Sequence, residues 1–203
     1  MSAATRHGLA LALSFLAGVS LTAVHAVWAE KETPPENKLP LDELRTFTGV
    51  LDAMVAERHM KVYRGLEEAG ELSVRLRATA KVYPEESVKD ALGRLEALRR
   101  DYRSENIAVH SAKFFLDGVL ENRTAAMIED YSDATGGNAP IMFDEDHLRD
   151  LFIAFDAARF QLHIHVIGDR ATRVALDRIE AAREINGAWP SLHQLAHVQV
   201  IHP

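Results

Sequence analysis

The chain has no cysteine among its 203 residues. Disulfide bridges, thiolate metal sites and cysteine nucleophiles are therefore excluded, which leaves His, Asp, Glu and Lys to carry any metal chemistry. The chain also lacks a long run of Lys or Arg, and its net charge of −7 argues against a nucleic-acid partner. It has no phosphate loop, nucleophile elbow or dinucleotide fingerprint. With 47% apolar and 26% charged residues, we expect a globular protein with a small-molecule substrate.

The most apolar stretch lies near the N-terminus, from Leu9 to Val27. Val27-Trp28-Ala29 is an acceptable cleavage site, so residues 1–29 are predicted to be an export signal and the protein to be periplasmic or exported. The stretch is nearly long enough to cross a bilayer, and an inner-membrane anchor through residues 8–29 is the alternative. Residues 30–40 combine charge with prolines and are predicted to be a linker.

Beyond the linker, the hydrophobic pattern predicts that helices and strands alternate. Residues 41–58 are predicted to form an amphipathic helix, because Leu44, Phe47, Leu51 and Met54 follow one another at helical spacing. The helical pattern continues to Gly70. Strands are then expected near 72–82, 107–115 and 160–166, and helices near 85–100, 144–158 and 170–184.

Three histidines are the strongest functional signal. His163 and His165 are two residues apart in a predicted strand, which places both imidazoles on one face, and His197 follows in a later strand. A single buried histidine is more often a hydrogen-bonded core residue than a ligand. A cluster of neutral imidazoles, however, is what Zn²⁺ or a similar ion requires. We therefore predict a metal or proton-transfer site at these strand ends.

Three further positions are candidates with plainer alternatives. Lys113 has an apolar flank that would desolvate its ammonium group and lower its pKa, although a lysine that faces solvent is the commoner case. Arg123 is a candidate for holding a substrate carboxylate, and a surface ion pair is the alternative. Asp117 and Asp169 each neighbour a glycine in a turn, where bonding to the backbone competes with catalysis.

Three motifs follow in order: Lys113-Phe-Phe-Leu-Asp-Gly with Arg123-Thr-Ala-Ala126, His163-Ile-His-Val-Ile-Gly-Asp-Arg-Ala171, and His193-Gln-Leu-Ala-His-Val-Gln199. Together they resemble the YtcJ-like metal-dependent amidohydrolases, a group that includes N-substituted formamide deformylases. The resemblance covers residues 59–203 and implies an α/β fold, the middle of a TIM-type (β/α)8 barrel. The spacing from His165 to His197 is close to the roughly 30 residues of one βα unit.

The resemblance implies that Lys113, His165 and His197 are catalytic residues and metal ligands, with a carbamate on Lys113 bridging two ions. Zn²⁺ is the expected metal, with Fe or Mn as alternatives, and the reaction is hydrolysis of an amide or formamide-type C–N bond by activated water. His163 would contact substrate or orient a ligand. Ala196 stands where the family usually has a glutamate, and the first-strand His-x-His pair and eighth-strand aspartate have no counterpart in this sequence.

Lys38–Leu51 resembles a different protein, the start of a mature carboxyl-terminal processing protease, but none of that protease's catalytic parts follows. This resemblance suggests a fusion or a mispredicted reading frame. The alternative function is therefore a non-catalytic exported or membrane-tethered interaction protein, in which residues 41–58 present an apolar stripe and unpaired strand edges favour oligomers. Metal bound through His165 and His197 would distinguish an enzyme from such a module.

Overall fold

The computed structural model describes residues 49–133 and 136–202. The predicted export segment, the linker and the first part of the predicted helix 41–58 lie outside the described residues. Within the described ranges, none of the helices combines the length and the apolar character that crossing a membrane requires.

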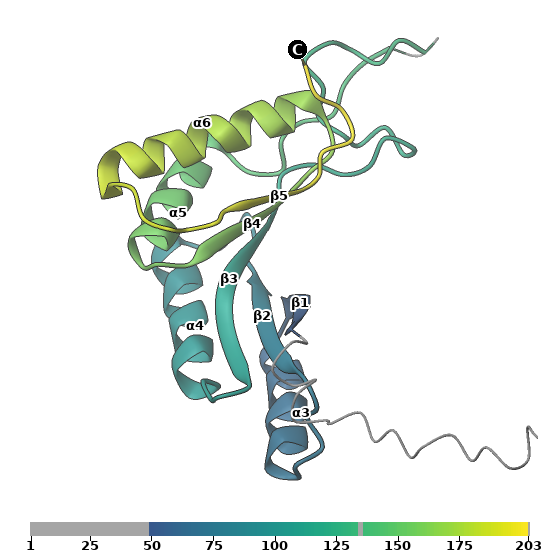
Figure 1. The fold of residues 1–203 in the computed structure, drawn as a ribbon. Helices are drawn as coiled ribbons and strands as arrows, with labels where there is room; N and C mark the ends of the chain where they lie inside the picture. The colour runs from purple at the N-terminus through teal and green to yellow at the C-terminus, as the bar shows by residue number, and fades with distance from the viewer. Residues whose placement is uncertain (1–48, 134–135, 203) are drawn as a thin grey trace, which may run out of the picture. The chain divides into compact units, whose positions relative to one another are not determined.

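A single sheet of five parallel strands organises this part of the chain (Figure 1). The strands follow one another in chain order across the sheet: β1 (Gly49–Val55), β2 (Arg75–Lys81), β3 (Ile107–Phe115), β4 (Gln161–Val166) and β5 (Gln194–His197). Each connection carries a helix: α3 (Glu57–Glu68), α4 (Val88–Asp101), α5 (Glu145–Ala157) and α6 (Asp169–Asn186). The sheet curls, and α4, α5 and α6 cover its outer face. This is a half-barrel, which confirms the predicted α/β fold of the TIM type.

The first described strand corrects the prediction of a helix at 41–58. Residues 49–55 form β1, which pairs in parallel with β2 from Gly49 opposite Arg75. Leu51 and Met54, two members of the predicted apolar stripe, are 43% and 52% exposed. The backbone N–H and C=O groups of β1 bond to β2, a partner that the spacing of apolar residues within one segment cannot reveal. The pairing therefore overrides the helical spacing of these residues. The helix begins only at Glu57.

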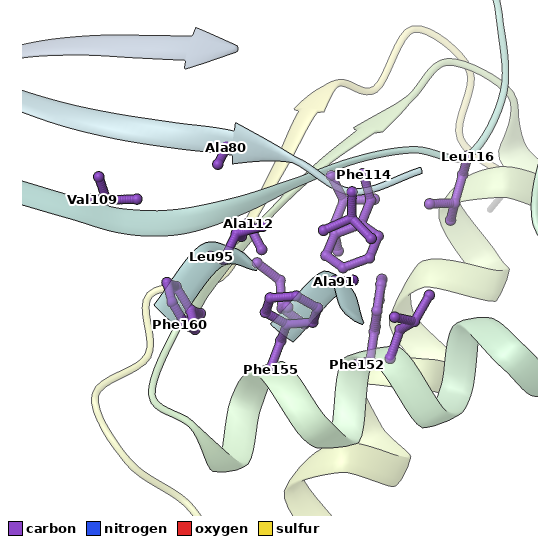
Figure 2. Close-up of a cluster of buried hydrophobic side chains, with 14 of the residues drawn as sticks. Ala80, Ala91, Leu95, Val109, Ala112, Phe114, Leu116, Phe152, Phe155 and Phe160 are labelled. Carbon is purple, nitrogen blue, oxygen red and sulfur yellow. The ribbon is translucent and has the colours of Figure 1, made fainter. Parts of the chain in front are cut away.

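A cluster of phenylalanines joins the outer face of the sheet to α5 (Figure 2). Phe114 of β3 lies with its ring centroid 4.9 Å from that of Phe152 and 5.8 Å from that of Phe155, and all three side chains are fully buried. Neighbouring side chains alternate across a strand. Because the Phe114 side chain packs against α5, Lys113 and Phe115 point to the concave, interior face of the half-barrel.

The register of β3 changes at His110. Ala78 of β2 pairs with Val109, but the next residue, Thr79, pairs with Ser111, so β3 contains one extra residue. Such a bulge reverses which positions face the core. It explains why the buried apolar positions of β3 are Ile107 and Val109 before the bulge and Ala112 and Phe114 after it. The bulge also sets Lys81 opposite Lys113 at the C-terminal ends of their strands.

Candidate metal centre

The strand register brings three of the predicted site residues together. Lys113 of β3 pairs with His163 of β4, and Phe115 pairs with His165. Directly paired residues of parallel strands point to the same face, so Lys113, His163 and His165 share the interior face near the C-terminal ends of the strands. Their side chains are buried, with 3%, 7% and 8% of each residue exposed. Active sites of TIM barrels are built at this end.

His197 joins the cluster through its backbone conformation. It pairs with Val166, which faces the helices, so strict alternation would turn it away from the site. The φ angles of +80° at His197 and +46° at Val198 end the strand there. Its ring centroid lies 4.5 Å from that of His165, with the planes at 64°. The imidazoles of His165 and His197 therefore lie side by side.

A backbone carbonyl orients His165. Its Nε2 lies 3.0 Å from the carbonyl oxygen of Gly118. Because a carbonyl only accepts, Nε2 carries the proton and Nδ1 carries the lone pair. Histidines that bind metals usually donate their second ring N–H in this way. The tautomer therefore leaves Nδ1 available as a ligand atom.

Lys113 has the environment that its flanking residues predict. Burial penalises the ammonium form and lowers the pKa of Lys113 to about 8. Its Nζ lies 4.8 Å from the centre of the Phe115 ring, and among the described residues no carboxylate forms an ion pair with it. Lys81, a residue that the sequence analysis did not single out, lies over the same ring at 5.2 Å. The sequence feature that could have identified Lys81 is its position at the end of a predicted strand.

His163 is a neutral imidazole without a hydrogen-bond partner for one of its nitrogens. Burial lowers the pKa of His163 to about 4, and the nearby charges of Lys113 and His197 add to that effect. The pKa of His197 is lowered as well, first by burial. Nδ1 of His163 is buried and accepts no hydrogen bond in the described part of the chain. A buried nitrogen left this way costs about 1–3 kcal/mol, so this position is unfavourable unless a ligand or an ion is supplied.

The Asp117 carboxylate ties the ends of β3 and β4 together. Oδ1 accepts from the N–H of Ile167 at 2.9 Å, and Oδ2 accepts from Gly168 at 2.8 Å and Ala126 at 3.0 Å. Asp117 is 1% exposed, and Oδ1 lies 3.8 Å from Nε2 of His165. The carboxylate therefore holds the backbone around His165. Asp117 thus has the backbone-bonding role that its place beside a glycine predicts as the alternative to catalysis.

Asp169 has a comparable role: its Oδ1 accepts from the backbone N–H of Ile128 at 2.7 Å and of Arg170 at 2.8 Å. It connects the start of α6 to the loop that follows β3. Both aspartates are thus engaged by backbone donors.

Arg123 lies in the loop after β3, where it pairs with Asp133 and donates to the carbonyl of Gly136. Its guanidinium also lies 5.0 Å from the centre of the Tyr131 ring. The structure does not bring it into the cavity beside His165. That cavity measures about 330 Å³ and is lined by Lys81, Phe115, Asp117, Gly118, Val119, Met142 and His165.

His165 and His197 could supply two ligands to a divalent cation, which needs a third protein ligand. In the described ranges, no three His, Asp or Glu side chains converge into a ligand group. His165 and His197 are adjacent, but both Asp117 oxygens are occupied by backbone N–H groups. Lys113 shares the interior face with His163 and His165, and the family resemblance implies that its nitrogen, or an anionic group built on it, is the third ligand.

This fold is that of the amidohydrolases. A profile of the amidohydrolase family matches residues 31–203, and the chain belongs to that family. The match begins well before residue 59, where the motif resemblance starts, and it includes the segment that resembles a protease leader.

Solved structures agree in fold and class. The chain is 28% identical to an uncharacterized metal-dependent hydrolase from Pyrococcus horikoshii OT3, with a TM-score of 0.55 over 66% of this chain and 26% of that one. It is 25% identical to a similar hydrolase from Pyrococcus furiosus, with a TM-score of 0.53 over 66% and 27%.

Among curated relatives, the chain is 30% identical to the exoenzymes regulatory protein AepA of Pectobacterium carotovorum over 139 residues, which are 68% of this chain and 29% of AepA. It is 26% identical to Protein LONG AFTER FAR-RED 3 of Arabidopsis thaliana over 163 residues, 80% of this chain and 27% of that protein. The chain therefore spans less than a third of these relatives.

Gly168 provides a sharp test of how closely the loops pack around Asp117. A Cβ at this position would lie 2.0 Å from the carbonyl oxygen of Ala126, so Gly168→Ala must displace backbone. We expect a loss of roughly 3 kcal/mol in the free energy of unfolding, measured by urea denaturation. Gly93→Ala is the matched control, because its Cβ would meet nothing within 4 Å in α4. It should stabilise by about 1 kcal/mol. Equal effects of the two substitutions would contradict the packing described here.

Removing the Asp117 carboxylate leaves three buried N–H groups without acceptors. We expect Asp117→Ala to lower the free energy of unfolding by at least about 3 kcal/mol, because each buried orphan donor costs about 1–3 kcal/mol. Asp130→Ala, at an exposed loop position, should stay within about 0.5 kcal/mol of the parent. Chemical denaturation of both variants makes the comparison, and a small change for Asp117→Ala would show that water replaces the carboxylate.

Acid should destabilise the metal-free protein through His163. The pKa of His163 is about 4 in the fold, compared with about 6.5 when it is unfolded, so the unfolded state binds more protons between these values. Stability is therefore expected to fall as the pH drops from about 6.5 to about 4. His163→Gln should make that decline shallower in denaturation midpoints measured across this range. An unchanged pH profile in the variant would assign the acid sensitivity to other groups.

Proposed function

We propose that this chain carries the fourth-, fifth- and sixth-strand part of a metal-dependent hydrolase site for amide or formamide-type C–N bonds. The observation that carries the proposal is the approach of the His165 and His197 rings to 4.5 Å beside a buried lysine at the C-terminal ends of the strands. Membership of the amidohydrolase family and likeness to two metal-dependent hydrolases support the same class.

In this proposal, Nδ1 of His165 and a ring nitrogen of His197 are the neutral ligands, and Lys113 supplies the anionic one. A divalent cation, with Zn²⁺ expected and Fe or Mn as alternatives, would polarise the substrate carbonyl and lower the pKa of a water molecule when bound. In this proposal, the neutral His163 on the same face would accept a hydrogen bond from substrate. The cavity of about 330 Å³ suits a small amide rather than a polymer.

Lys113 can become anionic by reaction with CO2. The neutral amine forms an N–C bond to CO2 and releases one proton, which leaves a carbamate with a net negative charge. Only the unprotonated amine reacts, and a pKa of about 8 makes about one lysine in ten neutral at pH 7, against about one in three thousand for an ordinary lysine. The burial of Lys113 therefore raises the fraction of the amine that can react with CO2.

Metal content of the purified full-length chain tests the proposal. We expect near-stoichiometric Zn²⁺, Fe²⁺ or Mn²⁺ by elemental analysis, and at least a tenfold loss in the double variant His165→Ala, His197→Ala, because two of three ligands are removed. Lys113→Gln should also lower the metal content. His147→Gln, at the start of α5 and outside the cluster, is the matched control and should retain it.

Bound metal that is lost in the variants would justify a screen of formamides and amides as substrates. A folded chain that binds no metal when Zn²⁺ and bicarbonate are supplied would overturn the proposal. It would favour the alternative, a non-catalytic interaction protein.

A further inference from the structure

A second cavity lies at the opposite end of the strands from His165. It measures about 380 Å³ and is formed where β3 and β4 begin and where the chain returns from α6 to β5. Its walls contain three arginines and a tryptophan, and no carboxylate is among the residues that line it: Arg99, Arg103, Ala108, Val109, His110, Arg159, Gln161, Trp189, Pro190, Ser191 and Leu192. In a chain of net charge −7, this concentration of positive charge needs an explanation.

Two of the three guanidinium groups have no carboxylate partner among the described residues. Arg99 is used by the fold, since its Nη1 donates to the carbonyl of Ala158 at 2.9 Å and its Nη2 lies 3.8 Å from Glu96. The guanidinium groups of Arg103 and Arg159, by contrast, form no hydrogen bond or ion pair with another described residue. Both line the cavity and are exposed, so an anion can reach them.

The tryptophan is held rigidly beside them. Nε1 of Trp189 donates to Asp156 at 2.7 Å, and that carboxylate is fully buried and also accepts from Asn186 and His193. The indole can therefore not turn freely, and the guanidinium of Arg159 lies 5.1 Å from the centre of its ring. The cavity thus combines a fixed flat apolar wall with two cationic groups.

The backbone of Arg159 does not suit an arginine. α5 ends in a Schellman turn, in which the N–H of Arg159 bonds to Asp156 at 3.0 Å and the N–H of Phe160 bonds to Phe155 at 2.9 Å. Arg159 occupies the left-handed position of that turn with φ of +61°, where glycine is the favoured residue. Leu192, which also lines the cavity, has φ of +50°. Local stability does not account for an arginine side chain at this position, which points to another role.

We propose that this cavity binds a small organic anion with a flat apolar body, of the aromatic carboxylate class. Arg103 and Arg159 would hold the carboxylate, and Trp189 would stack against the ring. A cavity of about 380 Å³ is of the size that small ligands occupy. The site is separate from the candidate metal centre, and its existence does not depend on the hydrolase function.

Trp189 reports directly on occupancy. The chain has two tryptophans, so Trp28→Phe leaves Trp189 as the only fluorophore of its kind. Titration of the full-length Trp28→Phe protein with benzoate should change its fluorescence in a saturable way, and added salt should weaken the binding. Benzyl alcohol, which lacks the charge, and inorganic phosphate, which lacks the ring, should bind at least about tenfold more weakly, because each forfeits one class of contact.

Substitutions separate binding from structure. Arg103→Gln and Arg159→Gly should each weaken benzoate binding by about tenfold or more, the effect of one lost charge-assisted hydrogen bond. Arg159→Gly should also raise the midpoint of thermal unfolding, because glycine adopts positive φ without strain. Arg58→Gln, at an exposed position on α3, is the matched control and should bind benzoate as the parent does.

A merely structural role for Arg159 predicts the reverse: a lower unfolding midpoint and an unchanged benzoate affinity. That result would overturn the proposal, as would unchanged benzoate affinity in both variants or equal binding of benzyl alcohol. Equal binding of phosphate would overturn the assignment to aromatic carboxylates.

Discussion

One buried carboxylate holds the candidate metal centre in shape. Asp117 leaves the end of β3 and accepts hydrogen bonds from three backbone N–H groups, two of them directly after β4. The same turn presents the Gly118 carbonyl that orients His165. Because the ends of β3 and β4 are joined at this point, Lys113 and His165 keep a fixed relative position, and α6 starts from a defined place.

Burial has two opposite consequences at this site. It lowers the pKa of Lys113 to about 8, which raises the neutral fraction of the amine, and lowers the pKa of His163 to about 4, which leaves that imidazole uncharged at pH 7. Neutral nitrogen is what a metal or CO2 requires, so the same desolvation that weakens the fold in acid prepares the residues for ligation. The other end of the strands holds uncompensated guanidinium groups around Trp189, so the two ends differ in the chemistry that they can support.

The predictions from the sequence succeeded where the local pattern is strong. β3 was predicted at 107–115, the bounds that it has, because its strand pattern lies between clear breaks. The prediction of a helix at 41–58 was wrong for residues 49–55, which form β1. The conformation of β1 depends on hydrogen bonds to β2, and the paired residues Gly49 and Arg75 are 26 positions apart in the sequence. Lys81 was missed, since only the bulge at His110 sets it opposite Lys113.

Amino-acid sequence by itself determined the order of helices and strands from residue 57 onward, the family, and which side chains can supply metal ligands. Periodicity is a local property, and it suffices to place His163 and His165 on one face of their strand. Only the tertiary structure decided that His197 turns toward His165, that Asp117 bonds to a loop some fifty residues away, and that Arg103 and Arg159 border one cavity. These outcomes depend on backbone angles and on contacts between distant segments, which no local pattern encodes.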